Sequence, residues 1–170
     1  MISGIYSTFV KTIFMDYLAT IQAPIRQEID DFNIYFKKQF TSNVELLNSA
    51  LSYVSESTGK LMRPMLVLLV AKSLGKVTER AFAAASAMEL LHSASLLHDD
   101  VIDESDMRRG RPSLNVAFNN NISVLTGDYL FSQALNNAAK TGDIRIIEEL
   151  AKLGKDLSSG EVMQVELEKE

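Results

Sequence analysis

The 170-residue chain has 17 basic and 22 acidic side chains, a formal net charge of −5 at pH 7, and 46% hydrophobic residues. This length and composition predict one domain over residues 1–170, and the mildly acidic balance argues against nucleic acid as the main partner. Cysteine is absent, which excludes disulfides and thiol chemistry and fits a reducing cytoplasm. No stretch approaches the roughly 20 uninterrupted apolar residues that a membrane span needs.

Residues 1–20 are apolar and aromatic at helical spacing. The segment lacks the basic beginning and the small-residue cleavage site of a signal peptide. We therefore expect a helix that packs on the domain or on a partner subunit, rather than one that attaches to a membrane.

The rest of the chain has helical periodicity and shows no strand alternation. Pro64 stands at the start of one apolar helix and Gly75 at its end, as their backbone preferences favour. The expected helices are 21–40, 44–54, 65–74, 79–103, 122–139 and 144–157, with a last one that begins at 158. These elements predict an all-α protein without an internal repeat or an interdomain linker.

The stretch 88–112 concentrates charged side chains at the end of the longest expected helix. At about 100° per residue, one narrow arc of this helix is polar and ends in two carboxylates one turn apart. That arc consists of Met88, His92, Ser95, Asp99 and Asp103, with Asp100 at its edge. The opposite arc is apolar and consists of Leu90, Ala94, Leu97 and Val101. The pattern predicts a helix with one side in the core and a polar stripe on the other.

Carboxylates in this DDxxD spacing are suited to Mg²⁺. Asp99, Asp100 and Asp103 repel one another unless a cation neutralises them, and Mg²⁺ typically combines one or two carboxylates with water and substrate phosphates. Arg108 and Arg109 add forked donors that match phosphate oxygens. Acidic runs at helix ends are usually solvated, but the apolar run before this one indicates a buried helix, which should not end in unpaired charges. We interpret the stretch as a metal-dependent diphosphate site.

Three sequence blocks occur together in this chain. The first consists of His92, His98, Asp99, Asp100, Asp103, Arg108, Arg109, Gly110 and Pro112. The second is a GKxxRP block with Gly59, Lys60, Arg63 and Pro64, and the third is a GExxQ block with Gly160, Glu161 and Gln164. In order and spacing they resemble the trans-isoprenyl diphosphate synthases, the polyprenyl synthase family. The resemblance begins near Leu18, so we treat residues 1–17 as a candidate N-terminal extension.

The resemblance implies an all-α antiparallel helical bundle of the isoprenoid synthase type, which works as a dimer. It also implies a prenyltransferase that adds isopentenyl diphosphate to an allylic diphosphate. Asp99, Asp100 and Asp103 would be catalytic, with Mg²⁺ held by Asp99 and Asp103. The remaining roles implied are allylic diphosphate binding by Arg108, isopentenyl diphosphate binding by Lys60, Arg63, His92 and Arg109, and support of metal-bound water by Glu161 and Gln164.

Some of these residues have other readings. Spacing alone explains His92 equally well as a packed core histidine, and Lys60 as a solvated surface lysine. The His98-Asp99 pair also matches an HD-type metal phosphohydrolase, which needs a further metal-binding histidine elsewhere in the fold. The two histidines of this chain lie on different sides of one helix, which argues against that reading.

One departure from the family pattern affects the expected activity. Family members carry a second aspartate-rich motif, and none occurs in these 170 residues, because Asp30-Asp31 lies on the wrong side and lacks a third acid. We therefore expect the N-terminal half of such an enzyme, truncated before its C-terminal helices and inactive by itself. Three alternatives remain. A class I terpene cyclase has no need of Lys60, Arg63 and Arg109 together, and a non-catalytic subunit of a heteromeric prenyl synthase usually loses the acidic motif. A purely structural helical bundle would leave the aspartates free in solution.

Two small residues, Ala94 and Ser95, come about one turn before Asp99. Short-chain members of the family commonly place an aromatic ring at one of these positions, which blocks the tunnel for the growing chain. Small side chains there predict a long-chain product beyond the C20 class. Close packing between helices is the alternative explanation for their size.

Overall fold

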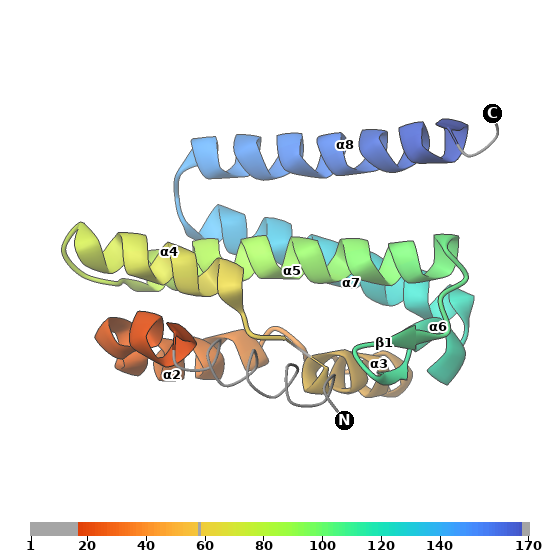
Figure 1. Cartoon of the computed structure of the whole chain (residues 1–170), viewed down its shortest axis with the longest axis horizontal. Coiled ribbons are helices and arrows are strands. Elements are labelled where there is room, and N and C mark those ends of the chain that lie inside the picture. The colour runs from red at the N-terminus through yellow and green to blue at the C-terminus, as the bar shows by residue number, and fades with distance from the viewer. Residues whose placement is uncertain (1–16, 58, 168–170) are drawn as a thin grey trace, which may run out of the picture.

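The computed structural model describes residues 17–57 and 59–167, and it is built almost entirely from helices (Figure 1). Residues 17–22 are helical and are followed by η1 (Ala23–Ile25), α2 (Arg26–Lys37), α3 (Glu45–Glu56), α4 (Met62–Ser73), α5 (Glu79–Ile102), α6 (Leu114–Ala117), α7 (Asn120–Lys140) and α8 (Ile144–Leu167). The all-α prediction is confirmed. The helix expected over residues 1–20 lies mostly outside the described residues.

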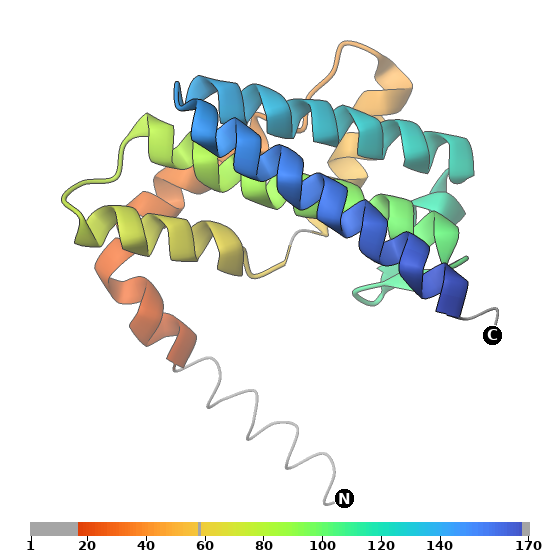
Figure 2. The same cartoon turned by 90° about the horizontal axis from the view of Figure 1, so that it is seen from above.

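The helices form three layers, with α2 and α3 on one side, α4, α5 and α7 in the middle, and α8 on the other side (Figure 1). Helix α5 is the central element, and its contact with α7 is the most extensive in the part of the chain that the structure describes. Seen from above, α8 runs diagonally across α5 (Figure 2). Buried alanines, including Ala87 and Ala94 on α5 and Ala134 and Ala138 on α7, let the helices approach closely.

Several predicted boundaries differ from the observed ones. The helix expected over 21–40 is divided, because a 3₁₀ turn at Ala23–Ile25 precedes α2. The two helices expected over 144–157 and from 158 onward are one continuous helix, α8, so Gly160 does not interrupt it. Helix α4 begins at Met62 and contains Pro64 in its first turn, where a missing N–H costs nothing.

The sequence prediction also missed a short antiparallel hairpin between α5 and α6. It consists of β1 (Met107–Arg108) and β2 (Arg111–Pro112), with Arg109 and Gly110 at the turn. Both turn residues have positive φ, 53° and 79°. Two-residue strands are too short for an alternating pattern to be visible in the sequence.

Within the described part of the chain, no helix combines the length and the apolar character needed to span a bilayer.

The α5–α7 contact depends on a glycine beneath a histidine. His98 on α5 lies over Gly127 on α7, and its Nε2 is 3.2 Å from the carbonyl oxygen of Val124 and 3.4 Å from Oδ1 of Asp128. A Cβ atom on Gly127 would lie 2.6 Å from Cδ2 of His98, and Nε2 would be closer still. Gly127 therefore gives the imidazole ring the space in which it packs.

We expect Gly127→Ala to lower the free energy of unfolding by about 1–2 kcal/mol, because the added methyl must displace the His98 ring. In a His98→Ala background the same change should stabilise the protein, since alanine favours a helix by up to about 1 kcal/mol over glycine. Gly160→Ala is the matched control, because a Cβ there meets no atom within 4 Å. Denaturant unfolding of the four variants measures the coupling, and equal effects of Gly127→Ala with and without His98 would contradict it.

Candidate functional site

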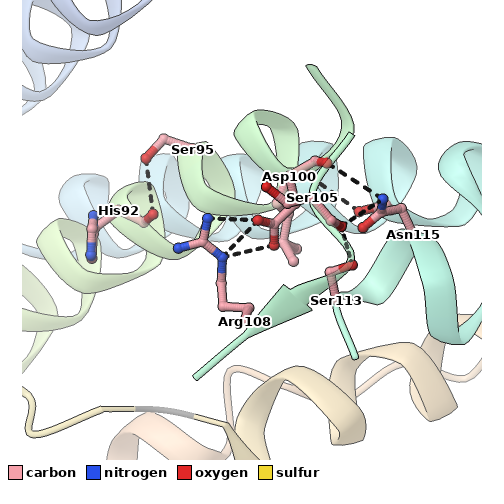
Figure 3. Close-up of polar contacts among 9 residues, drawn as sticks. His92, Ser95, Asp100, Ser105, Arg108, Ser113 and Asn115 are labelled. Carbon is pink, nitrogen blue, oxygen red and sulfur yellow. Dashed lines mark hydrogen bonds and ion pairs between the residues drawn. The ribbon is translucent and has the colours of Figure 1, made fainter. Parts of the chain in front are cut away.

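The C-terminal part of α5 carries the predicted polar stripe. Leu90 and Leu97 are buried, whereas Asp99 is half-buried and Asp103 is exposed at the end of the helix. His92 and Ser95 are half-buried, and the Ser95 hydroxyl donates to the carbonyl oxygen of His92 (2.9 Å; Figure 3). The burial pattern agrees with the arcs expected from the sequence. It places one side of α5 in the core and directs the other toward the hairpin and α8.

Asp100 is buried and paired with an arginine of the hairpin, whereas Asp99 is half-buried and Asp103 is exposed. The Asp100 carboxylate is 1% exposed and accepts from Arg108 through three contacts: Nε to both oxygens at 2.8 Å, and Nη2 to Oδ1 at 2.6 Å (Figure 3). This hydrogen bonding raises the pKa of Arg108 above its ordinary value. Asp100 therefore positions the first arginine of the RRG block.

The hairpin sends its two arginines in different directions. Arg108 points to α5, whereas Arg109 reaches back to the end of α3, where Nη1 donates to the carbonyl oxygen of Ser57 (2.8 Å). The hairpin is tied to α3 by the Tyr53 hydroxyl, which donates to the carbonyl oxygen of Pro112 (2.8 Å). The positive φ of Arg109 makes this divergence possible.

The GKxxRP block meets the RRG block in space. A Cβ atom on Gly59 would lie 2.6 Å from Nη1 of Arg109, so only a glycine lets the guanidinium group lie this close to the backbone. Lys60 follows directly, and the exposed Arg63 lies in the first turn of α4. Sequence blocks about 50 residues apart thus supply one basic cluster.

The positive charges of this basic cluster affect His92 electrostatically. Burial, and then the positive charges of Arg63, Arg109 and Arg108, lower the pKa of His92 below its ordinary value. The imidazole is therefore neutral at neutral pH and can donate or accept a hydrogen bond. The structure brings three of the predicted diphosphate-binding arginines around one histidine.

The acidic end of α5 faces α8. Burial, and then the negative charges of Glu161 and Asp103, raise the pKa of Asp99 above its ordinary value. Glu161 is half-buried and Gln164 is exposed one turn further along α8. Among residues 17–57 and 59–167, no three acidic or histidine side chains are already grouped as a metal cage, which agrees with the engagement of Asp100 by Arg108.

The sequence prediction missed a second buried carboxylate, Glu89. It is 5% exposed and lines a cavity with Ser93, Leu96, Asp100 and Arg109. Glu89 lies about three helical turns before Asp100 on nearly the same side of α5, a spacing that was visible in the sequence.

The two predicted chain-length residues have different surroundings. Ala94 is 1% exposed and belongs to the core cluster, whereas Ser95 is half-buried on the same side as Asp99. Of the two, Ser95 is therefore the one positioned on the polar side of α5.

Solved structures with the same arrangement of helices define the class as isoprenoid synthase folds. One is a decaprenyl diphosphate synthase from Rhodobacter capsulatus, with a TM-score of 0.78 and 36% identity over 88% of this chain and 46% of that one. Another is a polyprenyl synthase from Caulobacter crescentus CB15 complexed with calcium and isoprenyl diphosphate, with a TM-score of 0.82 and 28% identity over 87% of this chain and 45% of that one.

Sequence comparison gives the family. The Polyprenyl synthetase model matches residues 44–170, and the chain therefore belongs to the polyprenyl synthetase family. The chain is 36% identical over 139 residues to the octaprenyl diphosphate synthase of Escherichia coli (strain K12). The matched stretch covers 82% of this chain and 43% of that protein. The chain thus spans less than half the length of the relatives it matches.

We expect Asp100→Asn to lower the free energy of unfolding by about 2–3 kcal/mol, because it removes the buried partner of a guanidinium group that is itself partly exposed. Asp106→Asn is the control, since Asp106 is exposed and surface changes typically fall within about 0.5 kcal/mol. Urea unfolding of both variants makes the comparison. Equal stabilities would show that the ion pair contributes nothing to the fold.

Proposed function

We propose that the protein is a prenyltransferase that adds isopentenyl diphosphate units to an allylic diphosphate and makes a long-chain polyprenyl diphosphate. The observation that carries the proposal is the gathering of three separate sequence blocks around one helix. The positive charges of Arg63, Arg108 and Arg109 help to lower the pKa of His92 on α5. About two turns further along the same helix, the negative charge of Glu161 helps to raise the pKa of Asp99. A basic cluster beside an acidic cluster is what two diphosphates and a divalent cation require.

The basic cluster suits isopentenyl diphosphate. Arg63 and Arg109 offer planar forked donors, Lys60 adds a point charge, and the neutral His92 adds one hydrogen bond. Arg109 is held by the Ser57 carbonyl, so its guanidinium group is placed before a ligand arrives. In this proposal these four side chains bind and orient the diphosphate of the attacking substrate.

The acidic cluster suits Mg²⁺. Asp99 and Asp103 offer oxygen ligands one turn apart. Burial, and then the negative charges of Glu161 and Asp103, raise the pKa of Asp99, and a cation would neutralise those charges. In this proposal Glu161, whose negative charge acts on Asp99, and Gln164 would hydrogen-bond water on the metal. Mg²⁺ bound there would neutralise the negative charge of a departing diphosphate. The polyprenyl synthase from Caulobacter crescentus is complexed with calcium and isoprenyl diphosphate, which supports this pairing of cation and ligand.

The proposed reaction breaks the bond between the allylic carbon and the diphosphate oxygen, and the electron pair leaves with the diphosphate. The double bond of isopentenyl diphosphate attacks that carbon, and a proton is then lost. Arg108, fixed by Asp100, stabilises the departing diphosphate without first having to reorganise. The energy barrier arises from the separation of charge, and cations that are already in position lower this barrier.

Titration calorimetry and radiolabel incorporation test this function. The 170 residues contain the whole basic cluster, so we expect them to bind isopentenyl diphosphate. They contain one aspartate-rich motif, so we expect turnover only from a protein that joins them to a second such segment. Absence of isopentenyl diphosphate binding, or turnover of about 1 s⁻¹ or more by the 170 residues alone, would contradict the proposal.

The metal-binding role has its own prediction. Asp99→Ala and Asp103→Ala should each weaken Mg²⁺-dependent binding of an allylic diphosphate at least about tenfold, and should abolish turnover in a protein with both motifs. Asp106→Ala should leave both unchanged, because Asp106 lies beyond the stripe. Similar losses at all three positions would argue against a defined metal site.

The proposed long product depends on Ser95, and the similarity to the octaprenyl diphosphate synthase of Escherichia coli supports it. Ser95→Phe should shorten the product of a protein with both motifs, because a ring one turn before Asp99 would fill space needed by the growing chain. Ala94→Phe is less informative, since Ala94 is buried in the core. Thin-layer chromatography measures product length, and a wild-type product of C20 or shorter, or an unchanged long product from Ser95→Phe, would refute the assignment.

We also propose that the protein acts in the cytoplasm as a homodimer. Exposed apolar side chains support association. Leu66 and Val70 on α4 and Leu74 directly after it form a stripe, and Val162 and Met163 are exposed on α8. Sedimentation equilibrium should give twice the mass of one chain. A monomer at high micromolar concentration would contradict the dimer.

A further inference from the structure

Glu89 is a buried carboxylate that the proposed reaction does not use. It lies on α5 with 5% of its surface exposed, and its Oε2 has no hydrogen-bond partner among the described residues. Burying such a group costs several kcal/mol unless charges nearby compensate for it. A glutamine of the same shape would avoid the cost, so the presence of a carboxyl group at this position needs an explanation.

The compensating charges are those of Arg63 and Arg109. Burial raises the pKa of Glu89 above its ordinary value. The positive charges of Arg63 and Arg109 oppose this shift, because they favour the ionised carboxylate. Arg63 comes from the first turn of α4 and Arg109 from the hairpin, so the carboxylate stands where two separate segments converge. It lines the same cavity as Arg109.

The order of burial indicates what the carboxylate does. Glu89 is buried, whereas Arg63 and Arg109 are exposed. An anion that arrives from solvent therefore meets the guanidinium groups before it meets the carboxylate. Without a negative charge behind them, the two like-charged groups would repel each other and turn outward into water.

A second carboxylate on the same side of α5, that of Asp100, holds Arg108 in place from the buried side of the helix. Asp100 is buried and holds Arg108 through both of its oxygens. Helix α5 thus has two buried acids about three turns apart, each next to arginines from other segments.

We propose that Glu89 is a positioning residue, whose buried negative charge holds the Arg63 and Arg109 guanidinium groups in place for the diphosphate of isopentenyl diphosphate. The inference rests on the proposed function of that basic cluster. Placing the arginines in advance removes part of the entropy cost of binding.

The test is Glu89→Gln in the 170-residue chain, with titration calorimetry and thermal unfolding on the same samples. We expect isopentenyl diphosphate to bind about tenfold more weakly, and the midpoint of unfolding to stay the same or rise because a buried charge is removed. Binding of an allylic diphosphate with Mg²⁺ should not change. Glu89→Asp, which keeps the charge, should retain more affinity than Glu89→Gln.

Glu79→Gln is the matched control, since Glu79 is an exposed glutamate at the other end of α5 and should affect neither measurement. If the unaltered chain binds no isopentenyl diphosphate, the proposed function fails and this inference fails with it. If the unaltered chain binds and Glu89→Gln binds equally well or more tightly, only the positioning role is overturned. An equal loss for both diphosphates with a lower unfolding midpoint would also overturn it, because that is the result of a damaged fold.

Discussion

The bidentate ion pair between Asp100 and Arg108 connects the core of the protein to its candidate site. One partner is almost completely buried on the central helix and the other begins the hairpin, so the hairpin has a fixed position relative to α5. The position of Arg109 follows from it, because Arg109 is the next residue and its backbone angle sends the side chain toward Ser57. If Arg108 were free, the hairpin would keep its links to α3 but lose this ion pair with the central helix.

Helix α5 combines two properties that usually exclude each other. It is buried along most of its length, yet two carboxyl groups, those of Glu89 and Asp100, lie in its buried part. Both acids are next to arginines from other parts of the chain, which is the condition under which buried charge is tolerated. The energy that such an arrangement costs is offset by the extensive apolar contact between α5 and α7.

The sequence was sufficient for the class of fold and for the two sides of α5, because helical periodicity records which residues face the core. It also predicted Asp99 and Asp103 on one stripe. It could not show that Asp100 would be buried against Arg108, since an angle on a helical wheel does not say which distant side chain will be its partner. The hairpin escaped notice because it has only two residues in each strand. The approach of Glu161 to Asp99 could be expected only through family resemblance, because it depends on how α8 crosses α5 (Figure 2).

The contacts of the hairpin also suggest the order in which this region folds. The contact between Arg108 and Asp100 closes a loop of 8 residues, whereas the contact between Arg109 and Ser57 closes one of 52. Because the entropy cost of closure rises with loop length, the short loop is expected to form while the longer one is still open. The hairpin would then assemble on α5 as a local unit, and the basic cluster would be completed only when the segment before α4 docks onto it.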